Sequence, residues 1–280
     1  MDLTIAVQHN FLAYLRQFNG VPGIELYESD EVTWFVSTLG APGNHVVRTQ
    51  LAEAAEPARR VAKILEQIGR YTDWIDWLLF PGDSPAGLEL HLAACGLEPR
   101  EGSPWMVADL AELPPVPITP PAFRVERITD AGGLRLWRLV SAAGFEMSMP
   151  AVQPYYDAYI RQDKGPKAMS HCYIGYLGQE PVTSATLVLD GELAGIYDVS
   201  TPPRVRRRGF GRAITWAAMR DAQARGYRQV CLMASPLGRR LYESLGFTFC
   251  VLPHEYRWHK SSWVGSSPSV GRSSQSTLAV

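Results

Sequence analysis

The most informative stretch of this 280-residue chain is Val199-Ser200-Thr201-Pro202-Pro203-Arg204-Val205-Arg206-Arg207-Arg208-Gly209-Phe210-Gly211-Arg212. A strand-type run, Glu192 to Val199, leads into it, and a segment of helical periodicity, Gly211 to Arg225, follows it. When a strand passes through a glycine-containing turn into a helix, free backbone N–H groups point at one spot and the helix dipole adds positive potential. The two glycines permit close approach of a ligand, and the arginines add charge. The stretch therefore predicts a phosphate-binding loop.

Two other interpretations of R-x-x-G-x-G are a solvated basic turn and a contact patch for DNA. The chain has 27 Lys and Arg against 28 Asp and Glu, so its overall charge gives no reason to bind nucleic acid or an anionic membrane. An anion site must therefore be local, and neither nucleic acid nor a membrane is expected as a partner.

The elements around the loop predict an α/β (α+β) fold. Strand-type runs cover His171 to Leu177, Val182 to Leu189 and Glu192 to Val199, and we expect them to form an antiparallel meander. Asp190-Gly191 predicts a two-residue type I′ turn in it. A helix ending at Gly226, a strand over 229–234 and a second helix over 237–245 follow.

The chain divides at the proline-rich segment 113–121, which favours extended geometry over helix or sheet. We expect a first domain over 1–112, a second over 122–260 and a disordered, Ser/Gly-rich tail over 261–280. In the first half, strands are expected at 32–39, 45–51 and 74–80, and helices at 56–68 and 88–95. Its segment Leu92 to Leu97 corresponds to Tyr242 to Phe247, which indicates an internal duplication.

Residues 123–258 resemble the GNAT superfamily of N-acetyltransferases. The resemblance rests on Val199-Ser200-Thr201 leading through Pro203 to the Arg206 to Gly211 loop, and on the later segment Leu241-Tyr242-Glu243-Ser244-Leu245-Gly246-Phe247. It implies two GNAT-like domains, each a mixed, mainly antiparallel twisted sheet flanked by helices, with acetyl-CoA as acyl donor. The residues that it implies for acetyl-CoA binding are Val199, Ser200 and Thr201 for the pantetheine arm, Arg206, Arg207, Arg208, Gly209, Phe210, Gly211 and Arg212 for the pyrophosphate, and Ser235, which stands where many relatives have asparagine.

The resemblance also implies that Tyr242 is the general acid that protonates the departing thiolate. The general base stays open between Asp198, Glu146 and an ordered water chain, because Val230 stands where some relatives have glutamate. The acceptor site is expected over the helical segment 134–159. Its apolar candidates, of which half or more are expected to be ordinary packing residues, are Phe145, Met147, Met149, Tyr155, Tyr156 and Tyr159.

The function implied is acetyl transfer to a primary amine of a small molecule or a peptide N-terminus. A non-catalytic acyl-CoA sensor is the alternative, and it would keep the loop without needing Tyr242. The first half has no R-x-x-G-x-G loop and has Leu92 in place of Tyr242, so we expect a degenerate domain and one active site per chain. No histidine or cysteine spacing indicates a metal. No leader or spanning segment is seen, so a cytoplasmic location is expected, and an oligomer is possible.

Overall fold

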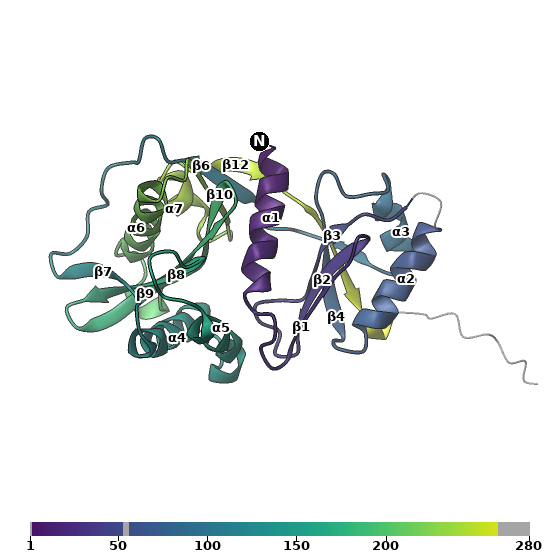
Figure 1. Cartoon of the computed structure of the whole chain (residues 1–280), viewed down its shortest axis with the longest axis horizontal. Coiled ribbons are helices and arrows are strands. Elements are labelled where there is room, and N and C mark those ends of the chain that lie inside the picture. Colours follow the sequence, from purple (N-terminus) through teal and green to yellow (C-terminus); the bar gives the residue numbers. More distant parts are fainter. Residues whose placement is uncertain (1, 53–55, 263–280) are drawn as a thin grey trace, which may run out of the picture.

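The computed structural model describes residues 2–52 and 56–262 and contains two sheets (Figure 1). The first has the strand order β1 (Ile24–Glu28), β2 (Val32–Ser37), β3 (His45–Thr49), β4 (Trp74–Leu79), β13 (His254–His259) and β5 (Glu98–Arg100). The second has the order β12 (Thr248–Val251), β6 (Trp105–Asp109), β11 (Gln229–Met233), β10 (Leu193–Ser200), β9 (Glu180–Asp190), β8 (Ser170–Leu177) and β7 (Phe123–Arg127). Neighbours are antiparallel except β3 with β4 and β10 with β11. The predicted fold class, two mixed and mainly antiparallel sheets, is confirmed.

The two sheets exchange strands. β6 follows β5 in the chain, yet it lies in the second sheet between β11 and β12. Reciprocally, β13 follows β12 and lies in the first sheet between β4 and β5. The proline-rich segment 113–121 therefore does not separate the strands of the two sheets. A strand from before it, β6, completes the second sheet, and a strand from after it, β13, completes the first. A strand-type sequence specifies its two faces but not the sheet edge that it joins, so the exchange could not be predicted from the sequence.

Helices cover both faces of the second sheet. Helix α6 (Phe210–Ala224) packs on one face, where alternate strand residues such as Leu187 and Ile196 point. Helices α4 (Ala131–Phe145) and α5 (Met149–Arg161) pack on the other, against residues such as Val188 and Tyr197. The short helix α7 (Arg239–Glu243) connects β11 to β12. In the first half, α2 (Pro57–Ile68) and α3 (Leu88–Ala94) cover the first sheet.

Helix α1 (Leu3–Arg16) stands between the two halves (Figure 1). Gln8 donates a 2.8 Å hydrogen bond to the carbonyl of Val47 in the first sheet, and Asn10 donates one of the same length to Leu193 in the second. The helix is buried on most of its surface, and only a narrow stripe with Ile5, His9 and Arg16 is exposed, so amphipathic periodicity did not predict it. The sequence feature that could have indicated this helix is the residue before it, Asp2, whose side chain accepts a hydrogen bond from the Thr4 amide at 2.9 Å.

Most other predicted elements match the structure within a few residues, with three differences. The turn between β9 and β10 consists of Gly191 and Glu192, and only Gly191 has a positive φ, of 52°. The type I′ turn at Asp190-Gly191 was therefore wrong: Asp190 pairs with Leu193 in the ladder, and one glycine suffices to reverse the chain. The helix expected over 237–245 is shorter, and residues 260–262 form a 3-10 turn (η2, Lys260–Ser262) after β13. The predicted disordered tail otherwise lies outside the described residues.

The two segments that indicated a duplication end their helices alike. The amide of Leu97 donates to the carbonyl of Leu92, and the amide of Phe247 donates to that of Tyr242, both at 3.1 Å. The glycine inside each segment has a left-handed φ, 82° at Gly96 and 87° at Gly246. Each segment follows the strand that makes the parallel pair of its sheet, so the two halves share both element order and local geometry.

Candidate active site

The predicted phosphate-binding loop lies between the end of β10 and the start of α6. After the 3-10 turn η1 (Pro203–Val205), Arg207 and Gly209 take left-handed φ angles of 65° and 83°, and α6 begins at Phe210. No side chain caps this helix. Its first N–H groups are therefore open to an anion, and the helix dipole favours one there.

The arginines at positions 206, 207, 208 and 212 have different surroundings. The guanidinium of Arg206 donates to the carbonyls of Thr201 and Gly144 at 2.9 and 2.8 Å, so it braces the loop against α4. Arg212 reaches the carbonyl of Ser244 at 3.4 Å and connects α6 to the α7 segment. Arg207 and Arg208 are exposed, and Arg208 lies 5.1 Å over the ring of Phe210. These last two are the arginines placed to meet an anion in solution.

The side chain of Phe210 packs in the core, whereas its backbone amide belongs to the phosphate-binding loop. Its ring is 1% exposed and stacks on Phe123 at 4.9 Å. This contact holds the first turn of α6 against the edge of the sheet. A β-carbon added at Gly209 would come within 3.3 Å of the carbonyl of Ile118, because the segment 113–121 passes beside α6. The loop is thus enclosed on one side by the chain that joins the halves.

A gap opens between β10 and β11 next to this loop. The parallel pairing consists of Ala194 with Val230 and Gly195 with Cys231, although β10 continues to Ser200. A bulge between Tyr197 and Ser200 shifts the register with β9, and Val199 lies inside it without a register partner on either neighbour. Unpaired main-chain groups at such a place are available to a ligand.

The end of β10 is supported from its other side. The carbonyl of Ser200 accepts a 2.7 Å hydrogen bond from the hydroxyl of Thr183, and the hydroxyls of Thr183 and Thr201 lie 3.0 Å apart. A β-carbon on Gly144 of α4 would come within 2.6 Å of the Ser200 hydroxyl. Helix α4 therefore packs directly on the predicted pantetheine-binding residues, and only glycine fits at this contact.

The loop and the later motif meet in space. A β-carbon on Gly211, in the first turn of α6, would lie 3.3 Å from Cδ1 of Leu241 and 3.6 Å from the hydroxyl of Thr201. The start of α6, the end of β10 and α7 therefore converge, which brings together residues about forty positions apart in the sequence.

Tyr242, the predicted acid, follows Leu241 on α7. Its side chain is 8% exposed, its ring lies against Gly238 and Phe247, and burial raises the pKa of the phenol to about 12. Burial is the sole cause of this shift, and among the described residues no hydrogen-bond partner of the hydroxyl is found. The phenol thus stays protonated at neutral pH, with its proton free to donate. Ser235, at the start of the same connection, is exposed, and its hydroxyl accepts from the amide of Gly238 at 3.2 Å.

The two candidate bases differ in setting. Asp198 lies at the bulge of β10 with a φ of 53° and is partly buried. Its carboxylate accepts from the hydroxyls of Tyr14 at 2.9 Å and Tyr159 at 2.6 Å. Glu146 ends α4 with its side chain 67% exposed and pairs with Arg206 at 3.3 Å.

The helical segment expected over 134–159 consists of α4 and α5. Tyr155 and Tyr159 are buried in the core, as packing residues are. Phe145 and Met149 are 45% and 38% exposed at the connection between the helices, whereas Met147 and Tyr156 are half-buried. The sequence interpretation did not include Tyr14, which lies on the unpredicted helix α1.

The first sheet has the same parallel pair but no gap. β3 and β4 pair at His45 with Asp76 and at Val46 with Trp77. Beyond that point the chain after β4 folds back against β3: the amide of Leu51 donates to the carbonyl of Ser84, and the amide of Ser84 donates to that of Thr49, both at 3.0 Å. The carboxylate of Asp83 also accepts from the amide of Thr49 at 3.1 Å. The protein's own backbone therefore occupies the place that is open in the second sheet.

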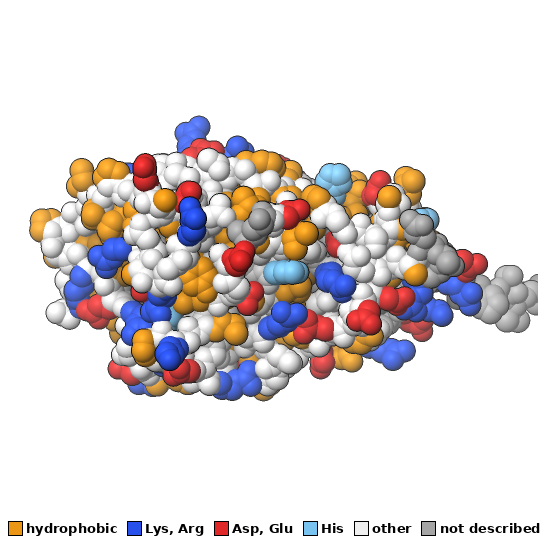
Figure 2. Space-filling model, turned by 45° about the horizontal axis from the view of Figure 1, so that its top comes forward, with side chains coloured by type: hydrophobic (Ala, Val, Ile, Leu, Met, Phe, Trp, Pro, Cys, Tyr) orange, Lys and Arg blue, Asp and Glu red, His pale blue; other side chains and the backbone are white. Residues whose placement is uncertain are grey.

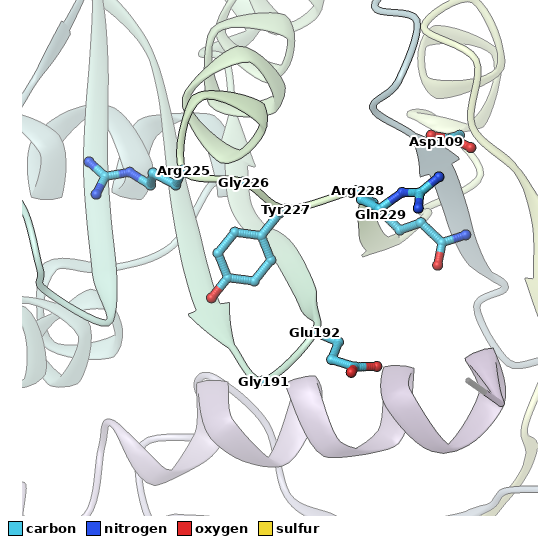
Figure 3. A pocket seen from close by; sticks show the side chains of 8 residues that line it. All are labelled: Asp109, Gly191, Glu192, Arg225, Gly226, Tyr227, Arg228 and Gln229. Carbon is cyan, nitrogen blue, oxygen red and sulfur yellow. The ribbon is translucent and has the colours of Figure 1, made fainter.

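A broad hollow of about 710 Å³ lies at the other end of α6 (Figure 3). Its lining includes Asp109, Glu192, Arg225 and Arg228, so both signs of charge face it. The 15 residues of α6 separate this hollow from the phosphate-binding loop by about 22 Å at 1.5 Å per residue. The hollow is thus not part of the site built by the loop, the gap and Tyr242.

Comparison with known proteins agrees with this geometry. Residues 136–247 match the family described as "Acetyltransferase (GNAT) family", and this part of the chain is a GNAT acetyltransferase domain. Across the whole chain the fold is that of tandem GNAT proteins. A GCN5-related N-acetyltransferase from Kribbella flavida has a TM-score of 0.62 at 14% identity, covering 89% of this chain and 94% of that one. A tandem GNAT protein from the clavulanic acid biosynthesis pathway has a TM-score of 0.62 at 12% identity, covering 90% and 87%.

A curated relative is similar over a shorter stretch. The mycothiol acetyltransferase of Thermobispora bispora is 41% identical over 71 residues, which are 24% of each chain. The match thus spans about a quarter of that relative's length.

Three further observations concern partners. Within 2–52 and 56–262, no helix combines the length and apolar character needed to cross a bilayer. The same residues contain no group of three His, Cys, Asp or Glu side chains that could hold a metal ion. On the face shown in Figure 2, acidic and basic side chains are interspersed and form no large patch of one sign.

Proposed function

We propose that the chain transfers an acetyl group from acetyl-CoA to a primary amine. The observation that carries this proposal is the convergence of the uncapped start of α6, the gap at the end of β10 and the phenol of Tyr242. Family membership of residues 136–247 supports the choice of acyl donor.

In this proposal, the main chain at Val199 to Thr201 holds the pantetheine arm in the gap. The amides of Arg207 to Arg212 bind the pyrophosphate, with the exposed side chains of Arg207 and Arg208 adding charge. Ser235 adds a hydroxyl at the edge of the gap. Arg206 acts through its braces to Thr201 and Gly144 and keeps the loop in shape.

Tyr242 is proposed as the acid for the departing thiolate. Burial raises its pKa to about 12, so the phenol is protonated throughout the neutral range. A donor without a competing partner is suited to stabilise charge that develops only as the C–S bond breaks.

Asp198 is the better of the two candidate bases. It is partly buried at the bulge beside the gap, where an amine attacking the thioester would come to lie. Glu146 is mostly exposed and already paired with Arg206, so its charge is largely screened by solvent.

The acceptor is proposed to be a small-molecule amine or a peptide N-terminus that enters at the connection between α4 and α5. Phe145 and Met149 offer exposed apolar surface there. The name of the Thermobispora relative makes the unacetylated form of mycothiol one specific amine to test.

The experiment is a thiol-release assay with acetyl-CoA and a panel of amines: unacetylated mycothiol, aminosugars, polyamines, amino acids and short peptides. Release that depends on one amine, with the acetylated product seen by mass spectrometry, supports the proposal. Tight binding of acetyl-CoA without turnover on any amine would instead support the acyl-CoA sensor. In the same assay, Tyr242→Phe tests the proposed acid. Its matched control is Tyr227→Phe, which changes a half-buried tyrosine at the far end of α6.

A further inference from the structure

One hydrogen bond to the candidate base Asp198 of the second half comes from the first half. The hydroxyl of Tyr14, on α1, donates to Oδ1 of Asp198 at 2.9 Å. The hydroxyl of Tyr159, on α5, donates to Oδ2 of the same carboxylate at 2.6 Å. Two helices from different parts of the chain thus hold the two oxygens of one carboxylate.

The ring of Tyr14 is itself held in place. It stacks on the ring of Tyr197 at 4.1 Å between centroids and 10° between planes. The hydroxyl of Tyr197 donates to Asn10 at 2.8 Å, one turn earlier on α1. Asn10 also donates to the carbonyl of Leu193. Helix α1 is therefore held against β10 at three residues, Leu193, Tyr197 and Asp198. The Tyr14 hydroxyl therefore has little freedom to leave the carboxylate.

The backbone at Asp198 explains why such support is needed. Its φ of 53° lies in the left-handed region, inside the bulge that interrupts the ladder with β9. A side chain on a bulge is aimed by the local backbone and not by pairing with its neighbours. The two hydroxyls supply the orientation that the ladder does not. Each carboxylate oxygen accepts more than one hydrogen bond, so acceptor capacity remains beyond the two phenols.

The hydroxyl groups around the Asp198 carboxyl favour its ionised form. Burial raises the pKa of Asp198, and the hydroxyls of Tyr159, Tyr14 and Thr186 lower it by donating to the charged form. The titratable groups that face it are Tyr14 on α1, Tyr155 and Tyr159 on α5, Cys172 on β8 and Tyr197 on β10. Burial raises the pKa of each of these phenols and of the thiol, so all are neutral near pH 7.

Resting on the proposed function, we propose that Tyr14 is a positioning residue of the active site: together with Tyr159 it orients the Asp198 carboxylate to accept a proton from the incoming ammonium. The neutral amine then attacks the thioester carbonyl, the C–N bond forms and the C–S bond breaks. The thiolate takes a proton from Tyr242, which recovers one from the second N–H of the former ammonium. Asp198 releases the first proton to solvent, so the products are the amide, coenzyme A and one proton.

This assigns a role to the first half. Its own sheet has no open gap, but its first helix completes the site in the second sheet. Tyr14 acts through Asp198 and does not touch the reacting atoms, so its removal should change the titration of Asp198 while leaving acetyl-CoA binding unchanged.

The test follows the Asp198 carboxyl directly by ¹³C NMR titration of the full chain labelled in aspartate. The Asp198→Asn variant identifies the resonance. In Tyr14→Phe, which keeps the stacked ring, we expect the midpoint to rise by about one pH unit, because a donor to the charged form is lost. Tyr159→Phe should shift it in the same direction and serves if Tyr14→Phe does not fold. Tyr173→Phe is the matched control, since this buried phenol donates to Asp221 on the opposite face of the sheet.

The second readout is thiol release with acetyl-CoA and the most active amine of the panel. Tyr14→Phe should lower kcat about tenfold and move the acid limb of the pH profile upward with the NMR midpoint, with an unchanged KM for acetyl-CoA. An unmoved NMR midpoint in both tyrosine variants would overturn the positioning role whether or not the protein has activity. A moved midpoint with an unmoved acid limb would exclude Asp198 as the base. Absence of turnover in the wild type, with the midpoint shifted as expected, would count against the proposed function alone.

Discussion

Arg257 and Asp76 are 181 positions apart in the sequence, yet the guanidinium Nε lies 2.6 Å from Oδ1 of the carboxylate. The second guanidinium nitrogen reaches Oδ2, so the pair is bidentate. Arg257 belongs to β13, the strand that the end of the chain contributes to the first sheet, and Asp76 belongs to its neighbour β4. The contact therefore joins the two halves within one ladder.

The strand exchange predicts that neither half folds alone. A fragment 122–280 lacks β6, which lies between β11 and β12, and a fragment 1–121 lacks β13 between β4 and β5. Each fragment would expose a central edge that is apolar on both faces. We expect each fragment to be insoluble when expressed singly and the two to form a soluble 1:1 complex when co-expressed. Co-purification through one tag measures this, and a folded, monomeric 122–280 would contradict it.

Replacing Tyr242 with phenylalanine should lower kcat by about 100-fold. The ring and its packing against Gly238 and Phe247 are retained, so the Kd for coenzyme A should stay within about twofold. Steady-state kinetics and calorimetry measure the two quantities. Unchanged turnover would remove Tyr242 from the mechanism.

Gly209→Val should abolish acetyl-CoA binding. The position has a φ of 83°, and its added side chain would meet the carbonyl of Ile118 beside the phosphate-binding loop. Gly226→Val is the control, because Gly226 has a φ of 89° at the other end of the same helix and open space around it. The control should lose stability yet bind acetyl-CoA with the wild-type Kd. Equal loss of binding in both variants would mean that the effect arises from backbone strain in α6.

One coenzyme A per chain is expected. In the first sheet, Ser84 and Asp83 fill the position that is open between β10 and β11. Calorimetric titration with coenzyme A should give a stoichiometry of one, and Gly209→Val should reduce it to zero. A second site that persists in this variant would show that the first half binds the ligand after all.

Glu255 should make the stability of the fold depend on pH. Burial, followed by the neighbouring Asp76, raises the pKa of Glu255 from 4.5 to about 7, while Arg100 and Arg257 oppose the shift. The folded state thus binds a proton that the unfolded state has released, so stability falls as pH rises from about 4.5 to about 7 and is level above that.

Glu255→Gln removes this titration. At pH 8 the variant should be more stable than the wild type by about 1–2 kcal/mol, a reduced figure because the side chain is partly exposed. Near pH 4.5 the difference should vanish. Urea unfolding at the two pH values measures it, with the exposed Glu98→Gln on β5 as control. A difference that is the same at both pH values would show that Glu255 does not titrate in this range.

Much of the site could be predicted because its parts are local in the sequence. The Arg206 to Gly211 loop joins a strand to a helix, and the left-handed φ at Gly209 and the missing side-chain cap at α6 depend on the residues in the loop itself. The same holds for Tyr242, whose helix ends at Gly246 through local hydrogen bonds. Tyr14 could not be found in this way, because its role depends on where a helix 184 positions earlier packs.

By itself, the sequence determined the type of most elements around the loop, and it predicted the phosphate-binding loop, the tyrosine near it and a first half without such a loop. These features follow from residue chemistry and short-range periodicity. Only the tertiary structure decided which sheet receives β6 and β13, that α1 lies between the halves, and that Asp198 and not Glu146 is held by two phenols. Those outcomes depend on which apolar surfaces meet when both halves fold together. The hydrophobic effect that drives this burial is not directional, so a strand or helix pattern names the face to be buried and leaves its partner open.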